Sequence, residues 1–143
     1  SSYADMKLTD VRVQVNRGMG RPFQYGGFSP DHVHSVLASK LRSVINAANP
    51  GGTRAARAEV KLSSITIATK GGRKPAYDSV IIASATFFDV ATGAQIGGRE
   101  NLGAQASYRP AFLGGQDRVL SPQQELELIT THSVSALAKK IYG

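Results

Sequence analysis

The dipeptide Ser-Pro occurs at two places in this 143-residue sequence, 29–30 and 121–122, and each copy precedes a helical pattern. A serine at that position caps a helix by accepting a hydrogen bond from a free backbone N–H, and proline suits the first helical position because no N–H is needed there. Apolar residues then recur every three or four positions, which defines one buried side for each helix. Asn-Pro-Gly-Gly at 49–52 ends the first pattern. Everything between the two helices has to be built from other elements.

Two segments alternate apolar and polar residues, which is the pattern of a strand with one buried face. The first covers residues 6–15 and the second covers residues 57–68. In each of them the apolar residues change phase once, near Thr9-Asp10 in the first and at Ser63-Ser64 in the second. An extra residue in a strand produces such a change, so we expect a β-bulge at both places.

Residues 77–90 are largely apolar in both phases, which predicts a central strand that is covered on both faces. The turn residues 89–93 follow, with Gly93 supplying a positive φ, and they lead into a weaker strand over 94–100 that extends towards Tyr108. The order is β-α-β-β-β-α. With strands paired mainly as hairpins and both helices on one face, it predicts a single α+β domain over 1–143, a two-layer sandwich with a mainly antiparallel sheet.

Composition and motifs argue against several classes of function. There is no cysteine, hence no disulfide framework, thiolate nucleophile or cysteine zinc site. His32 and His34 are two positions apart, which on a helix directs them to different sides, so no metal site is predicted. The sequence contains neither a phosphate-binding Gly-Lys-Ser/Thr nor a Gly-x-Ser-x-Gly elbow. We therefore predict no catalytic residue, no cofactor and no enzymatic activity.

The positive charge is concentrated in the first half of the chain. The net charge is +7, and residues 1–74 contain twelve Lys or Arg against only four acids. Such a half attracts polyanions, and charge alone leaves nucleic acid, anionic lipid and an acidic protein face all open. Five basic residues flank the strand at 57–68 and form the predicted anion-binding set: Arg54, Arg57, Lys70, Arg73 and Lys74.

Two long loops, 18–28 and 108–119, hold most of the remaining candidates for binding. Loops of that length in a compact domain are usually functional or disordered, and both combine aromatic residues with arginine. Leu128 joins this set because the helical spacing directs it away from the apolar side of the last helix. The predicted partner-binding residues are Arg17, Arg21, Phe23, Tyr25, Phe28, Tyr108, Arg109, Phe112 and Leu128.

The order of elements, together with one local motif, resembles a known group of proteins. The chain starts with Ser1-Ser2, its central strand ends in Asp-Val-Ala-Thr-Gly at 89–93, and it closes with an Ala- and Leu-rich helix ending at 136–140. In this it resembles small periplasmic and outer-membrane lipoproteins of Gram-negative bacteria, whose α+β domain is similar to the TolB amino-terminal domain and the curli-secretion lipoprotein. The resemblance implies an acylated cysteine just before Ser1, and a role as adaptor, assembly factor or structural part of an envelope machine.

Two hypotheses follow from these observations. The first is a non-enzymatic lipoprotein of the periplasm, anchored to the outer membrane by an N-terminal lipid, that binds a protein partner or further copies of itself. Its start at Ser1 suits a cleaved export signal, although loss of an initiator Met explains it too. The alternative is a basic nucleic-acid-binding module, favoured by the charge of residues 1–74.

Overall fold

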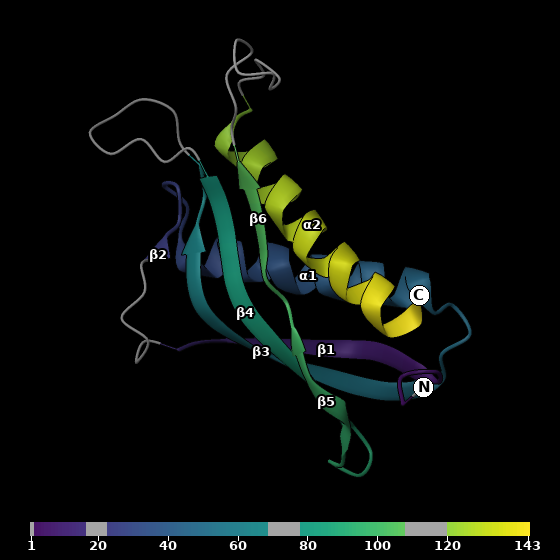
Figure 1. The fold of residues 1–143 in the computed structure, drawn as a ribbon. Coiled ribbons are helices and arrows are strands. Elements are labelled where there is room, and N and C mark those ends of the chain that lie inside the picture. The colour runs from purple at the N-terminus through teal and green to yellow at the C-terminus, as the bar shows by residue number, and fades with distance from the viewer. Residues whose placement is uncertain (1, 17–22, 69–77, 108–119) are drawn as a thin grey trace.

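The computed structural model describes residues 2–16, 23–68, 78–107 and 120–143 (Figure 1). Within these residues, two helices and a mixed six-stranded sheet form an α+β fold, as predicted. The elements in chain order are β1 (Met6–Val15), β2 (Phe23–Gln24), α1 (Pro30–Ala48), β3 (Arg54–Thr66), β4 (Asp78–Asp89), β5 (Gln95–Asn101), β6 (Ala104–Ser107) and α2 (Pro122–Tyr142). None of the described helices is long and apolar enough to span a membrane.

Both helices begin where the sequence places them, and for the predicted reason. The Ser29 hydroxyl accepts a hydrogen bond from the N–H of His32 at 3.1 Å. At the start of α2, the Ser121 hydroxyl accepts from the N–H of Gln124 at 3.1 Å, while the Gln124 side chain accepts from the N–H of Ser121 at 2.9 Å. This reciprocal pair is a capping box, which satisfies two N–H groups that the helix itself leaves unpaired.

The sheet has the strand order β1-β3-β4-β5, with β2 beside the end of β3 and β6 beside β4. The pairs of β4 with β3, β5 and β6 are antiparallel, whereas β1 and β2 run parallel to β3. Both predicted bulges are present, between Leu8 and Asp10 in β1 and between Leu62 and Ser64 in β3. The predicted strand from 94 towards 108 is split into β5 and β6, because Leu102 turns into the core and its N–H donates to the carbonyl of Ala83.

The two helices lie side by side and cover one face of the sheet (Figure 1). Alternate residues of β3 and β4 point to the helices, and among them Leu62 and Phe87 are fully buried. The other residues of these strands point the opposite way, where Ile82 is 37% exposed. The expectation that the strand at 77–90 is covered on both faces is therefore wrong. We call the side of the sheet away from the helices the open face, formed by residues such as Arg57, Lys61, Ile82 and Phe88.

The Asp-x-x-Thr-Gly motif forms the turn after β4. One carboxylate oxygen of Asp89 accepts hydrogen bonds from the N–H groups of Ala91 at 2.7 Å and Thr92 at 2.9 Å, and the other accepts from Arg54 Nε at 2.5 Å. Gly93 has the predicted positive φ, 75°. The hydrogen bond from Arg54 lowers the pKa of Asp89 below its ordinary value, with help from the two backbone N–H groups. The motif therefore has a structural role, which is to close the β4–β5 hairpin.

A candidate docking surface on the open face of the sheet

A shallow groove of about 490 Å³ crosses the open face. It runs over the strands at the centre of the sheet, and its lining is mostly polar around one exposed aliphatic side chain. Its lining includes Asn16, Lys61, Ser63, Ile82, Arg99 and Asn101. A groove that is this open and this polar does not enclose a small molecule, since ligand pockets are typically concave and lined mainly by apolar side chains.

The charges on the open face fall into two groups. Arg57 pairs with Glu59 at 3.3 Å, and its guanidinium lies 5.5 Å from the centre of the Phe88 ring. In contrast, no ion pair within the described part of the chain involves Lys61 or Arg99. These two cations line the same groove as Ile82, so the groove combines positive charge with one exposed aliphatic side chain.

Glu100 holds one rim of the groove in place. One of its carboxylate oxygens accepts a hydrogen bond from the Tyr3 hydroxyl at 2.9 Å, and the other lies 3.1 Å from Lys140 Nζ on α2. Burial of Tyr3, reinforced by this hydrogen bond to a carboxylate, raises the pKa of Tyr3 to about 12. The N-terminal segment, β5 and α2 are thus joined at a single carboxylate, which makes the rim a fixed edge.

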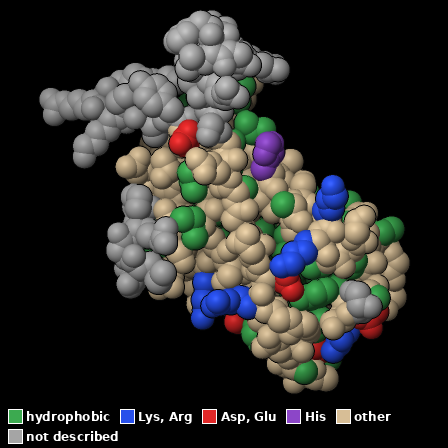
Figure 2. All heavy atoms as spheres, in the orientation of Figure 1, with side chains coloured by type: hydrophobic (Ala, Val, Ile, Leu, Met, Phe, Trp, Pro, Cys, Tyr) green, Lys and Arg blue, Asp and Glu red, His purple; other side chains and the backbone are tan. Residues whose placement is uncertain are grey.

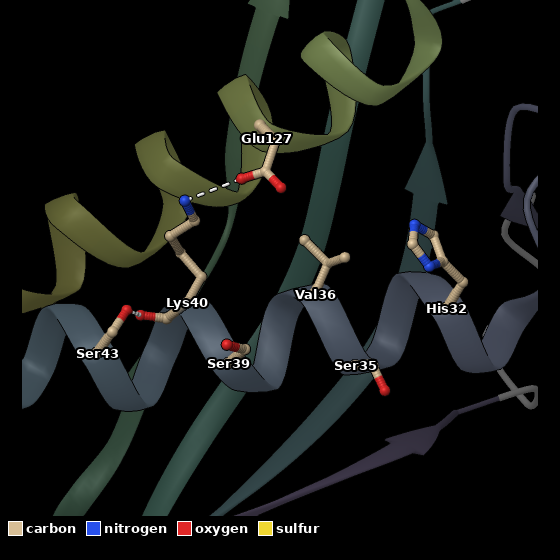
Figure 3. A pocket seen from close by; sticks show the side chains of 7 residues that line it. All are labelled: His32, Ser35, Val36, Ser39, Lys40, Ser43 and Glu127. Atoms are coloured by element: carbon tan, nitrogen blue, oxygen red, sulfur yellow. Dashed lines mark hydrogen bonds and ion pairs between the residues drawn. The ribbon is translucent and has the colours of Figure 1, made fainter.

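A second groove, of about 340 Å³, lies between the outer sides of α1 and α2 (Figure 3). Lys40 Nζ bridges it to Glu127 at 2.9 Å, and His32 Nε2 lies 3.2 Å from the Gln123 side-chain oxygen. Val36 points towards α2 in Figure 3, whereas Ser35 points away from it. The charged groups in this groove already bind each other, so we interpret it as a contact between the two helices.

The predicted aromatic residues gather near the start of α1. Phe23 and Tyr25 stack with ring centres 6.2 Å apart, and the Tyr25 hydroxyl lies 3.3 Å from His34 Nε2. The Phe28 ring lies 5.0 Å from that of His32. All three aromatic side chains are half-buried and pack against the core, and burial lowers the pKa of His34. The structure thus brings Phe23, Tyr25 and Phe28 together at the edge of the hydrophobic core. Their role in partner binding stays a prediction.

The other predicted site residues have different positions. Leu128 is half-buried on α2, and Arg54 and Arg57 are both held in ion pairs, with Asp89 and Glu59. No group of three metal-ligating side chains occurs among the described residues. Eight predicted residues lie outside the described part of the chain: Arg17, Arg21, Lys70, Arg73, Lys74, Tyr108, Arg109 and Phe112.

Most of the cationic side chains visible in Figure 2 lie beside acidic ones. The described ion pairs show the same pattern, because Arg12, Arg54, Arg57, Lys40 and Lys140 each have an acidic partner within 4 Å. Both described members of the predicted anion-binding set, Arg54 and Arg57, are therefore neutralised locally. Sequence reasoning missed Lys61, Ile82 and Arg99 as candidate site residues. The only sequence signal for them is that they lie in strands whose side chains point alternately to the two faces of the sheet.

No family model matches this chain, and no curated protein is significantly similar to it in sequence. Several solved structures resemble it at low identity. A crystal structure described as an uncharacterized protein is 14% identical, with 96% of this chain and 92% of that chain covered and a TM-score of 0.55. The PelC dodecamer from Paraburkholderia phytofirmans is 15% identical over 94% and 91% of the chains, with a TM-score of 0.48. A putative lipoprotein from Caulobacter crescentus CB15 is 12% identical over 99% and 90%, with a TM-score of 0.42.

The first of these likenesses shows that the fold is shared with a protein of similar length. At 14% identity it extends to the fold and no further. The α+β architecture derived above from the residues therefore has an independent counterpart among solved structures.

Proposed function

We propose that this chain is a non-enzymatic cell-envelope lipoprotein that acts as an adaptor or structural subunit of a protein assembly, and that it binds its partner through the open face. The observation that carries the proposal is that Ile82, on the central strand, is exposed in a groove that Lys61 and Arg99 also line, on a face that no described helix covers. The envelope location and the lipid anchor, in the periplasm at the outer membrane, rest on the sequence resemblance.

The chemistry of the open face supports a protein partner. Protein interfaces combine an aromatic or aliphatic centre and arginine with a polar rim. Here Phe88 lies under the Arg57 guanidinium towards one end of β4, and Ile82 is exposed further along the same strand, in the groove with serine and asparagine side chains. The partner best matched to this surface presents an apolar side chain flanked by carboxylates, which would approach Lys61 and Arg99.

Nucleic acid, the alternative partner, is less well supported by the described residues. A phosphate backbone is bound by several free cations along one path. On the open face, Arg12 is paired with Asp10 and Arg57 with Glu59, which leaves Lys7, Lys61 and Arg99 as the cations without an ion pair in the described part of this face. Lys7 lies at the far end of β1 from the groove, and so few separate charges suit a local protein contact better than a long polyanion.

The test is site-specific photo-crosslinking in living cells that express the full-length gene product. A photoreactive amino acid at position 82 is expected to give an ultraviolet-dependent protein adduct of defined mass, and Lys61→Glu combined with Arg99→Glu is expected to abolish it. The matched control is the same amino acid at Ser135, which is exposed on α2. Equal adducts at both positions, or no adduct at 82, would contradict the proposal, and an adduct removed by nuclease would favour the alternative.

The lipid anchor is tested separately by labelling the same cells with an alkyne fatty acid. The proposal predicts that the full-length product carries the label. Absence of the label would contradict the lipoprotein part of the proposal. The proposed docking surface would not be affected, because the crosslinking experiment tests it independently.

A further inference from the structure

Along the outer edge of β1, every second residue directs its backbone N–H and C=O groups away from the sheet. The N–H of Asn16 donates to the carbonyl of Leu62 at 2.8 Å, so the backbone groups of Asn16 point towards β3. Backbone groups point alternately to the two sides of a strand. Counting back along β1, the N–H and C=O groups of Val11, Val13 and Val15 point away from β3, towards the outside of the sheet.

The N-terminal half of the same edge is already covered by α1. Asn46 Oδ1 accepts a hydrogen bond from the N–H of Leu8 at 2.8 Å, and Asn46 Nδ2 donates to the carbonyl of Leu8 at 2.8 Å. Asn49 Nδ2 donates to the carbonyl of Met6 at 3.0 Å. The bulge between Leu8 and Asp10 ends this covered half. Beyond it, no hydrogen bond from the described residues reaches the outward groups of the three valines.

We propose that the open half of the β1 edge pairs with the same segment of a second copy of this chain, antiparallel, about a two-fold axis at Val13. In this register Val13 lies opposite itself and Val11 lies opposite Val15 of the second copy. Directly opposed residues whose backbone groups face each other exchange both hydrogen bonds in an antiparallel pair. Every outward N–H and C=O of the three valines thereby gains a partner.

The side chains of β1 suit this pairing because the segment has the same pattern in both directions. Val-Arg-Val-Gln-Val at 11–15 places Arg12 opposite Gln14 of the second copy, so no like charges face each other. Arg12 and Gln14 are exposed, whereas the three valines are half-buried, and Val11 and Val13 pack against the core on the helix side. Pairing would join the two rows of valines into one. A second copy is therefore the occupant that this edge matches.

The usual protections of an edge strand are weak in this segment. Natural edges are interrupted by proline, by bulges or by repeated charges, and residues 11–15 contain one charge and no proline. The opposite side of the sheet is different, because the outer strands β5 and β6 are short and are interrupted at Leu102 and Gly103. The β1 edge is distinct from the open face, so this pairing and the proposed function can each fail without the other.

The test is sedimentation velocity of the 143-residue chain over a range of concentrations, with two variants of opposite charge. Gln14→Lys would place a like charge opposite Arg12 twice in the dimer, which is expected to raise the dimer dissociation constant roughly two- to thirtyfold. Gln14→Glu would create two opposite-charge pairs and is expected to lower it by a similar factor. Gln95→Lys, an equal change of charge at an exposed position on β5, is the matched control and is expected to leave it unchanged.

A wild-type chain that stays monomeric at every concentration would overturn the pairing. So would a dimer, or a larger oligomer, whose dissociation constant responds equally to Gln14→Lys and Gln95→Lys. Circular dichroism of each variant establishes that it is folded, which is expected because Gln14 is exposed.

Discussion

Replacement of Asn46 by alanine tests how α1 is attached to the sheet. The Asn46 side chain forms two hydrogen bonds with the backbone of Leu8, both 2.8 Å long, and it covers the edge of β1 there. A hydrogen bond in a protein contributes about 0.5–1.5 kcal/mol to stability, so loss of both costs about 1–3 kcal/mol. Alanine favours a helix over asparagine by up to about 0.7 kcal/mol, which offsets part of this loss. With the full offset, the expected net decrease in the free energy of unfolding is about 0.3–2.3 kcal/mol.

Urea unfolding followed by circular dichroism measures this decrease directly. The control is Ser43→Ala, an exposed position one turn earlier whose hydroxyl donates within α1 to the carbonyl of Lys40 at 3.1 Å. It is expected to change stability by less than about 0.5 kcal/mol. If Asn46→Ala is as stable as Ser43→Ala, the two bonds to Leu8 contribute nothing, and the account of how α1 covers this edge is refuted.

Three further predictions concern other contacts. Ser133→Ala removes a buried hydrogen bond of 2.6 Å to the carbonyl of Leu102 and leaves that oxygen unpaired, so urea unfolding should show a loss of about 1–3 kcal/mol. Asp89→Asn should destabilise the chain at pH 7. Because the folded state lowers the pKa of Asp89, its stabilising effect is fully present above the unfolded value of 3.8 and is lost as the pH falls through the lower folded-state pKa, so the difference between wild type and variant should shrink progressively as the pH falls below 3.8. The difference between wild type and Tyr3→Phe in absorbance at 295 nm should titrate near pH 12, and a midpoint near 10 would contradict the buried hydrogen bond to Glu100.

The elements governed by local chemistry were predictable from the sequence. The caps at Ser29 and Ser121 depend on residues within four positions, and the bulges after Leu8 and Leu62 appear as a change of phase within one strand. The parallel pairing of β1 with β3 was not predicted as such. It depends on how α1 crosses between the two strands, and the residues of either strand alone do not record it.

The open face was misjudged for a physical reason. Ile81 and Ile82 are adjacent and chemically alike, yet Ile81 is 1% exposed and Ile82 is 37% exposed. The sequence shows that both phases of β4 are apolar, but it does not show whether a second layer exists to cover the outer one. Lys61 and Arg99 were missed for a related reason, because a cation in an alternating strand has the same pattern whether it is merely solvated or binds a partner.

The most direct test of the central claim, that the open face is a docking surface, uses the absence of cysteine from the 143-residue chain. Ile82→Cys would introduce a unique thiol in the groove, and Ser135→Cys would introduce one on the exposed side of α2. The rate of maleimide labelling is compared between the purified chain and the full-length protein in intact cells. We predict that the thiol at 82 reacts readily in the purified chain and is protected in cells, while the thiol at 135 reacts in both. Equal labelling at 82 in both settings would contradict the claim.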